Sequence, residues 1–524
     1  MQVEQSLSLA NPAPIHTTMR QKVGLSAVTI GFLMLMVAFF SPEYSGNSAI
    51  WSPVLYFTLM TALMVGGAVV FIHEEYKGKP EGIKNTGTLF HSLTSREALM
   101  GLLVSLVAWL ALTQLPAFGM GSFTSWAAYW VVQLGVVAYM GYKMFKRETF
   151  SQMGARGLGA WMLGIFLTGF YVVLYWYGEK MVGLVAIFDP LSKFVRNSPA
   201  DQWFVYGTIY TVSVLVMGYK FALKYKHNRY QLLRTASVCG FQLGFSFLIP
   251  SFLKMMNEPE YYFSYFWPLK TDPLKPDGIN YIVQSSSHGI GWYFIAFSAL
   301  MTFFGVPILT YFFGKRWYCS WVCGCGGLAE TVGDPFRQLS DKSLGAWKFE
   351  RWMIHSVLVA VVIMTALLWI NSAYQGGVLG DFSHGFSKTY GFLVGSMFSG
   401  VVGTGFYPIL GSRGWCRFGC PQAAILGIFQ KKKSKFRITT NGGQCISCGN
   451  CSTYCEMGID VRSYAQRGQD VVRASCVGCG ICAAVCPRGV LRLENGDLDI
   501  NERAEAVRAI HVKDGILEVD NTIN

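Results

Sequence analysis

The sequence predicts an all-α polytopic membrane protein of about ten transmembrane helices, followed by a small C-terminal α+β domain of the bacterial two-[4Fe–4S] ferredoxin type. Two observations predict this fold. Of the 524 residues, 52% are hydrophobic and 14% are charged, whereas a soluble chain carries about 25% charged residues. Near the C-terminus, eight cysteines have the spacing of cluster-binding ferredoxins. The low charge content excludes a soluble enzyme, a disordered regulator and a coiled coil.

Apolar segments long enough to cross about 30 Å of hydrocarbon recur along the chain. We expect spans at Leu25–Phe40, Ile50–Ile72, Ala98–Leu115, Trp126–Met144, Gly157–Tyr177, Trp203–Leu223, Leu232–Pro250, Gly291–Phe313, Trp352–Ile370 and Tyr390–Leu410. A polar leading segment favours a retained first span over a cleaved signal peptide. The spans form an N-terminal region, residues 1–290, to which the sequence assigns no function, and a second region, residues 291–430.

Lys and Arg concentrate in the N-terminal segment, in alternate loops and in the tail, and the net charge is +13. Cytoplasmic loops of membrane proteins are enriched in these residues, so we interpret the charge as a topology signal and expect no nucleic-acid partner. With an even number of spans, both termini are expected in the cytoplasm.

Thirteen of the fourteen cysteines follow Phe313, on the side expected to be cytoplasmic. Disulfides are rare in a reducing compartment, so these cysteines are expected to bind metal or to do redox work. Eight of them form two C-x2-C-x2-C-x3-C runs, and in two-cluster ferredoxins the fourth cysteine of each run binds the other cluster. Cluster one is therefore expected on Cys445, Cys448, Cys451 and Cys486, and cluster two on Cys476, Cys479, Cys482 and Cys455. A zinc module would not need this interleaved fourth position.

The ferredoxin-type domain is expected over residues 441–495, after a basic linker at residues 431–440 and before a tail at residues 496–524. The linker either anchors to lipid headgroups or docks an acidic partner such as a soluble ferredoxin. Glu456 follows Cys455 at a position where Pro is commoner. A carboxylate beside the second cluster is expected to lower its reduction potential.

Two further cysteine motifs directly follow predicted spans. They are Cys319-Ser-Trp-Val-Cys323-Gly-Cys325 and Cys416-Arg-Phe-Gly-Cys420-Pro421. Each has a pair of cysteines four residues apart, which on a helix would place both thiols on one face. If the two motifs meet, they can hold a third cluster or another metal, or form a dithiol relay. Packing of small, polarizable thiols is the alternative.

With these motifs, the chain from about residue 291 to 493 resembles the NapH/NosR/CcoG-like membrane polyferredoxins, in which paired CxxxCP motifs close membrane spans and a ferredoxin domain follows. The family's motif cysteines correspond to Cys319, Cys323, Cys416 and Cys420, whereas Gly324 replaces the first proline and Cys325 is an additional thiol. The resemblance implies a protein of the bacterial cytoplasmic membrane that passes electrons between cytoplasmic [4Fe–4S] clusters and the quinone pool or a periplasmic redox partner.

The histidines do not predict a haem, because among the eight only His355 lies clearly within a predicted span. His288 and His384 are expected at the outer face, where they are candidates for an external quinol site. Carboxylates are nearly absent from the predicted span cores, which disfavours an ion pump. The sequence contains no Walker or dinucleotide motif.

The leading functional hypothesis is therefore an oxidoreductase or electron-transfer component in the lipid bilayer, with a quinone and soluble or membrane redox proteins as partners. An alternative from the resembled family is an accessory protein that supplies reducing equivalents for the maturation of a respiratory metal centre. A third possibility is an electron-transfer subunit of a larger complex.

Overall fold

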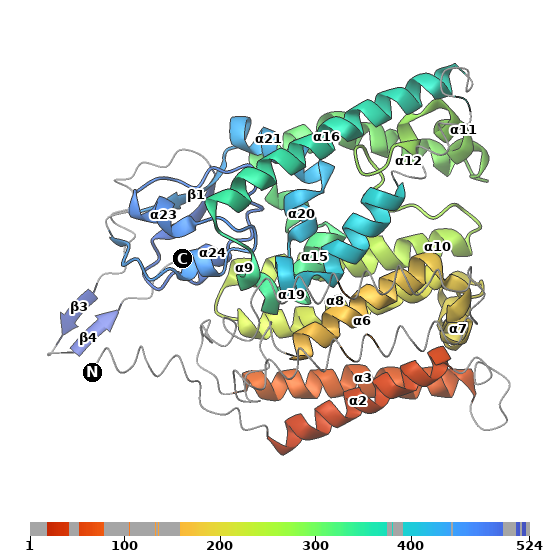
Figure 1. Ribbon diagram of the computed structural model, residues 1–524, viewed down its shortest axis with the longest axis horizontal. Coiled ribbons are helices and arrows are strands. Elements are labelled where there is room, and N and C mark those ends of the chain that lie inside the picture. The colour runs from red at the N-terminus through yellow and green to blue at the C-terminus, as the bar shows by residue number, and fades with distance from the viewer. Residues whose placement is uncertain are drawn as a thin grey trace.

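The computed structural model describes residues 18–40, 52–77, 158–374, 391–441 and 444–495, the strands at 510–513 and 516–519, and a few isolated positions between them. Long helices lie side by side along one direction, and a ferredoxin-type unit is attached at one end of them (Figure 1). We call this the ferredoxin end. Helices α10 and α11 lie at the opposite end (Figure 1).

Six helical segments of the described chain are long and apolar enough to cross a membrane. They are α2 (Met19–Phe40), α3 (Pro53–Tyr76), α8 (Gln202–Lys224), the continuous helix Arg229–Met255, the continuous helix Ile290–Phe313, and α16 (Leu344–Ala373). A further pair, α6 (Leu158–Trp176) with η4 (Gly178–Met181) and α7 (Val182–Arg196), is bent by 110° and is either a broken span or a re-entrant loop. These helices make the chain a membrane protein.

The expected number of about ten spans is not reached in the part of the chain that the structure describes, which holds six or, with the bent pair, seven. Two predicted spans, Ala98–Leu115 and Trp126–Met144, lie outside the described residues. The last predicted span, Tyr390–Leu410, is not one regular helix. It consists of the π-helix η9 (Gly391–Val402) and the short helices α18 (Gly403–Gly405) and α19 (Tyr407–Leu410). The helix is interrupted at Phe406, and a side chain at Gly403 would collide with Trp415.

Two of the spans contain a π-helical turn directly before a proline. The helix Arg229–Met255 runs through α9 (Arg229–Leu243), η5 (Gly244–Leu248) and α10 (Ile249–Met255), with Pro250 just after the wide turn. The helix Ile290–Phe313 repeats this order in α12 (Ile290–Leu300), η7 (Met301–Gly305) and α13 (Val306–Phe313), with Pro307 after its π-turn. Proline has no N–H, and its ring clashes with the preceding turn, so a locally wider helix accommodates it.

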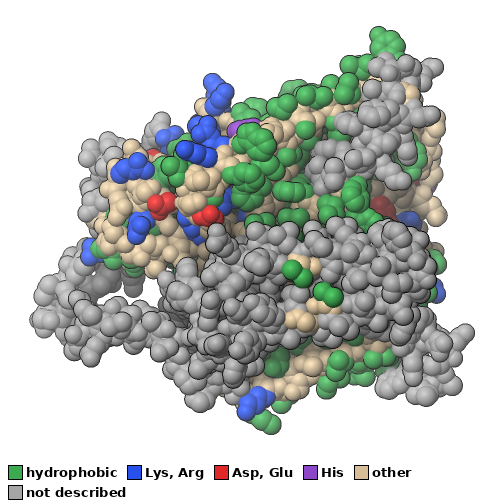
Figure 2. Space-filling view, viewed as in Figure 1, with side chains coloured by type: hydrophobic (Ala, Val, Ile, Leu, Met, Phe, Trp, Pro, Cys, Tyr) green, Lys and Arg blue, Asp and Glu red, His purple; other side chains and the backbone are tan. Residues whose placement is uncertain are grey.

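The outward surface of the spans is apolar. On α16 the exposed side chains include Trp352, Val359, Val362, Ile363 and Trp369, and hydrophobic side chains follow this helix in Figure 2. In the same view Lys and Arg gather toward the ferredoxin end (Figure 2). An exposed apolar face of this length is stable in hydrocarbon, whereas in water it would promote aggregation.

At the end opposite the ferredoxin unit, η6 (Asp272–Leu274) and α11 (Pro276–Gln284) connect two spans. His288, a candidate for a quinol site, has a structural contact here: its Nδ1 lies 2.8 Å from Glu258 Oε1. Glu258 also accepts hydrogen bonds from the backbone N–H groups of Ser287 and His288. His384 lies outside the described residues.

We predict that this loop loses stability on acidification. The hydrogen bonds from His288 and Ser287 lower the pKa of Glu258. A carboxyl group with a lowered pKa stabilises the fold above its unfolded pKa, and that contribution is lost as the pH falls through its folded pKa. The difference in melting temperature between the protein and its Glu258→Gln variant should therefore be largest near neutral pH and shrink in acid. A difference that is independent of pH would contradict this assignment.

The ferredoxin-type unit is built on two antiparallel strands, β1 (Phe436–Thr440) and β2 (Leu491–Asn495). Between them lie α22 (Asn450–Thr453), α23 (Val461–Gln466) and α24 (Ile481–Ala484), and β3 (Ile510–Lys513) pairs with β4 (Ile516–Val519) farther along the chain. The predicted linker at residues 431–440 is not a linker. Its first residues end helix α21 (Pro421–Lys433), and its last five form β1, because strand β2 needs an antiparallel partner within the unit.

Candidate metal centres

Each membrane-edge motif has the shape of a short helix, a turn and a second helix. Cys319 ends α14 (Arg316–Cys319), and Cys323 is the N-cap of α15 (Gly324–Thr331). Cys416 lies in α20 (Gly414–Phe418), and Cys420 is the N-cap of α21. The expectation that each pair shares one face of a continuous helix is therefore wrong. The chain breaks between the two cysteines, and each second cysteine lies at a helix N-terminus, where the helix dipole favours a thiolate.

The two motifs have the same backbone hydrogen bond. The N–H of Cys323 donates to the carbonyl of Tyr318 at 2.8 Å, and the N–H of Cys420 donates to the carbonyl of Trp415 at 3.1 Å. In both cases the acceptor precedes the first cysteine of its motif. The motifs, almost a hundred residues apart in sequence, are thus structural repeats of one another.

The repeats bring four thiols together. Burial raises the pKa of the Cys420 thiol, and the nearby thiols of Cys416, Cys319 and Cys323 raise it further. Burial also raises the pKa of Cys319, to about 12, with contributions from Cys323 and Cys416 in the same direction. We call Cys319, Cys323, Cys416 and Cys420 the edge set. Four thiols that destabilise each other's charged forms require a cation between them if all are to be thiolates.

Cys325 lies beside this set. Its hydrogen bond to Cys323, together with the N–H of Gly326 and the charge of Arg413, lowers the pKa of Cys323 to about 6 against the effect of burial. Cys325 is exposed, and it lines a cavity of the membrane part.

The eight ferredoxin-type cysteines separate into two neighbourhoods. Burial raises the pKa of Cys451 to about 11, and the other thiols that raise it are those of Cys486, Cys448 and Cys445. For Cys482, burial is again the main cause of a raised pKa, followed by the thiols of Cys479, Cys476 and Cys455, and then by that of Cys451 from the first group. Cys445, Cys448, Cys451 and Cys486 line one small cavity, and the assignment of four cysteines to each cluster stays a prediction.

The residues fit [4Fe–4S] clusters by the chemistry of their donors. All the cysteines are free thiols, and each neighbourhood supplies the four thiolates that such a cluster takes. The first ferredoxin set lines a small cavity of about 20 Å³. Cys448 of this set is exposed, whereas Cys476 and Cys482 of the second set are buried.

The loop of the second set is held by side chains of the membrane part. Ser320, next to Cys319, donates to the carbonyl of Val477 at 2.8 Å. Gln430 donates to the carbonyl of Cys476 at 2.8 Å, and Gln231 to that of Cys479 at 3.0 Å. The edge set and the second ferredoxin set are therefore separated by one hydrogen-bonded contact, and Cys319, Cys416, Cys476 and Cys482 belong to one hydrophobic core.

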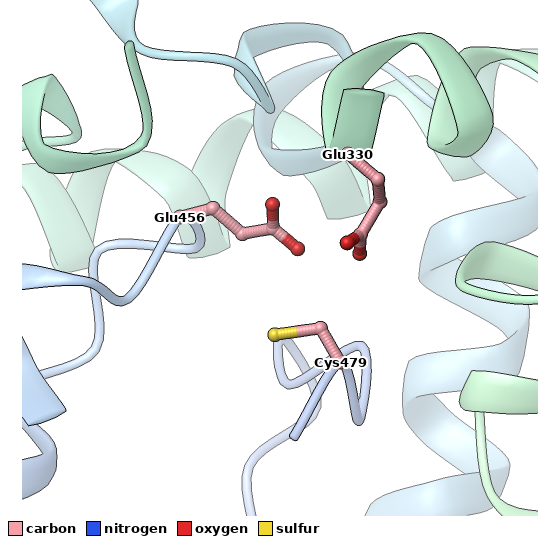
Figure 3. A group of neighbouring side chains, drawn as sticks. All are labelled: Glu330, Glu456 and Cys479. Atoms are coloured by element: carbon pink, nitrogen blue, oxygen red, sulfur yellow. The ribbon is translucent and has the colours of Figure 1, made fainter. Parts of the chain in front are cut away.

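A cluster of buried charges lies at the same junction. The carboxylates of Glu330 and Glu456 and the sulfur of Cys479 point toward one another (Figure 3), with one atom of each within 4.8 Å of the others. Glu330 comes from α15, while the other two come from loops of the ferredoxin-type unit. We call Glu330, Glu456, Arg234, Arg337 and Arg413 the junction cluster.

Arg413 connects the junction cluster to the edge set. Its Nη2 lies 2.6 Å from Glu330 Oε1 and 3.1 Å from Glu456 Oε1, and its Nη1 donates to the carbonyl of Cys319 at 3.0 Å. The same Nη1 is 3.9 Å from the sulfur of Cys416. Because the arginines already neutralise both glutamates, we interpret the group around Cys479 as an electrostatic junction and not as a separate metal site.

The arginines change what is expected of Glu456. Its carboxylate lies 2.9 Å from Arg337 Nη1. Burial alone would raise its pKa, but Arg337, Arg413 and Arg234 lower it to about 2. The paired arginines offset the charge that was expected to lower the potential of the neighbouring cluster. The cysteine pattern singled out Glu456, whereas the arginines and Glu330 carry no spacing signal and were not predicted.

A cavity of about 1030 Å³ reaches the edge set from the opposite side. Cys325, Cys416, Ser412 and Trp415 line its inner end. Its walls are rich in tyrosines: Tyr171, Tyr175, Tyr206, Tyr210 and Tyr407. Tyr210 is within hydrogen-bonding distance of Gln242 Oε1 (3.0 Å) and of the carbonyl of Gly324 (2.7 Å). Ser412 also lines the cavity, and its hydroxyl is buried and has no hydrogen-bond partner in the described structure.

Membrane-spanning helices, sets of four thiols and a ferredoxin-type unit define the class of the protein: a membrane iron–sulfur protein with a role in electron transfer. Comparison with known families supports this class. A model of a 4Fe–4S binding domain matches residues 295–343 and again residues 391–439, and a model of a 4Fe–4S dicluster domain matches residues 444–491. The two copies of the first domain contain one edge motif each. These matches support two or more [4Fe–4S] clusters.

Among curated proteins, the chain is similar to "Putative electron transport protein YccM" of Escherichia coli (strain K12), with 28% identity over 162 residues. The match covers 29% of this chain and 44% of that protein. The chain thus spans less than half the length of this relative. No solved structure matches the chain.

Proposed function

We propose that the protein transfers electrons between a donor or acceptor at the ferredoxin end and a quinone in the membrane. In this proposal Cys445, Cys448, Cys451 and Cys486 hold one [4Fe–4S] cluster, Cys476, Cys479, Cys482 and Cys455 hold a second, and the edge set holds a third. Clusters of this type supply one-electron transfer when bound. The ferredoxin end is assigned to the cytoplasm because of the charge distribution of the loops.

The order of the three cysteine sets is the observation that carries this proposal. Cys448 of the first set is exposed, the second set lies deeper, and Ser320 joins the second set to the edge set through one hydrogen bond. The edge set in turn adjoins the cavity through Cys416. The chain therefore arranges its thiols in a series from an exposed surface to a cavity within the membrane part.

The cavity suits a quinone headgroup. Ligand sites are mostly apolar with a few well-placed polar groups, and this cavity combines aromatic walls with the hydroxyls of Tyr210 and Ser412. The Ser412 hydroxyl, which has no hydrogen-bond partner in the described structure, would donate to a quinone carbonyl oxygen beside the edge set once its side chain turns into the cavity. The external site suggested by His288 is less suitable, because Glu258 already binds the Nδ1 atom of its imidazole.

The experiment uses the full chain, purified anaerobically in detergent and reduced with dithionite. After excess reductant is removed, a soluble quinone analogue is added and the EPR signals of the reduced clusters are followed. Rapid reoxidation supports the proposal. If intact clusters stay reduced for minutes, direct exchange with quinone is refuted, and a supply of electrons to another protein becomes the better interpretation.

We predict that Ser412→Ala weakens the interaction with the quinone analogue. A hydrogen bond contributes about 0.5–1.5 kcal/mol, so the apparent KM should rise by about 2–10-fold while the cluster signals are unchanged. Ser198→Ala is the matched control, because the Ser198 hydroxyl is also buried without a partner in the described structure but does not line the cavity. An equal KM for both variants would remove Ser412 from the quinone site.

A further inference from the structure

The cavity extends from the edge set to the end of the molecule opposite the ferredoxin unit. Its inner end is formed by Cys325 and Cys416. Its other end includes Glu260, Lys254, Lys270 and Asp272. Lys254 lies in α10 and the other three lie in the segment between α10 and α11, the helices at the far end in Figure 1. Ion pairs join these charges, with Lys270 Nζ 3.0 Å from Asp272 Oδ2. Charged residues at the cavity mouth mark contact with water, since uncompensated charges are costly in hydrocarbon.

Hydroxyl groups continue inward from this charged mouth. Tyr262 donates to Glu260 at 3.1 Å at the mouth. Deeper in the cavity, the hydroxyls of Tyr171 and Tyr206 lie 3.3 Å apart, and the rings of Tyr206 and Tyr210 are neighbours with centroids 6.1 Å apart. Tyrosine hydroxyls both donate and accept hydrogen bonds, so these residues and water in the cavity can pass protons between the mouth and the inner end.

On the side that faces the ferredoxin-type unit, the edge set adjoins a hydrophobic core instead of a cavity. There the cysteines pack in a hydrophobic core with residues of the ferredoxin-type unit, including Val477 and Cys476. The charges at this junction are held in ion pairs, as for Arg413 with Glu330. Electrons therefore have a short path to the edge set from the ferredoxin end, while the tyrosine-lined cavity leads to the opposite face.

We propose that electrons and protons reach the quinone from opposite sides of the membrane, so that turnover moves net charge across it. This inference rests on the proposed quinone reaction and adds its sidedness. The balanced reaction is quinone + 2 e⁻ + 2 H⁺ → quinol, in which a one-electron donor at the ferredoxin end is oxidised and both protons come through the cavity from the opposite face. In the reverse direction, quinol oxidation releases its protons to that face.

The test uses the full chain in sealed proteoliposomes that contain a short-chain benzoquinone in the bilayer and the pH dye pyranine in the lumen. An impermeant, electrochemically reduced sulfonated viologen serves as the donor, so only molecules with the ferredoxin end outward react. We expect the lumen to become alkaline, with protons consumed in equal number to the electrons transferred. A protonophore should abolish the pH change and accelerate turnover.

Two variants sharpen the test. Tyr171→Phe combined with Tyr206→Phe removes the hydrogen-bonded hydroxyl pair and should slow lumenal proton uptake and turnover together by several-fold. Tyr293→Phe, at a residue that is 75% exposed and does not line the cavity, is the matched control and should behave as the unaltered protein.

The outcomes separate the two proposals. If viologen oxidation by quinone proceeds in vesicles but the lumenal pH stays constant, the protons come from the ferredoxin side and the sidedness inference is overturned. If no quinone is reduced even by the detergent-solubilised protein, the proposed function itself fails, and the inference fails with it.

Discussion

Replacing Cys416 and Cys420 together by Ser should remove one cluster and stop electron transfer to quinone. The two serines preserve the volume of the edge set but cannot replace two thiolate ligands. The bound iron should fall from about twelve to about eight atoms per chain, because each [4Fe–4S] cluster needs its four thiolates. The remaining EPR signals should be those of the two ferredoxin-type clusters, since their eight cysteines are unaltered.

Iron analysis, EPR and the reoxidation experiment measure this result on the same sample. Cys239→Ser is the matched control. Cys239 lies on α9, where its sulfur packs against Gly218, and it belongs to none of the three cysteine sets. It should keep its full iron content and rate. Full iron content and rapid reoxidation in the Cys416→Ser, Cys420→Ser double variant would show that the edge set has only a packing role.

Arg413→Gln should destabilise the junction between the membrane part and the ferredoxin-type unit. The guanidinium is buried and pairs with both Glu330 and Glu456, so its loss leaves two buried carboxylates short of compensating charge. Breaking a buried ion pair in this way costs about 3–5 kcal/mol. Arg413→Lys should recover only part of this stability, because one ammonium cannot bridge two carboxylates and the Cys319 carbonyl with the geometry of a guanidinium.

The midpoint of chemical denaturation in detergent, followed by tryptophan fluorescence, measures the effect. Lys193→Gln is the control for loss of an exposed ion pair. Lys193 Nζ lies 3.2 Å from Asp189 Oδ2 with 63% of its side chain exposed, and such pairs contribute about 0–1 kcal/mol. Equal destabilisation by Arg413→Gln and Lys193→Gln would show that the junction cluster is solvated and weak. A larger loss for Arg413→Gln confirms that it holds the two parts together.

Local sequence patterns were sufficient to predict those features that depend on residues close together in the chain. Cys445 and its neighbours follow a pattern that wraps one cluster, and a model of a 4Fe–4S dicluster domain matches residues 444–491. Apolar length likewise predicted helices such as α3 and α16, because the hydrocarbon thickness sets the length of a span. The division of the last predicted span into η9, α18 and α19 was not predicted, and the close packing at Gly403 depends on Trp415 from another helix.

The sequence by itself determined that the protein is a membrane protein with two ferredoxin-type cysteine sets, because apolar length and cysteine spacing act within short stretches of chain. Only the tertiary structure decided that the two edge motifs meet, that Arg413 bridges Glu330 and Glu456, and that a tyrosine-lined cavity ends at Cys416. These features join residues from distant helices and loops. Their energies come from burial and from charges brought close by folding, and no local pattern encodes those distances.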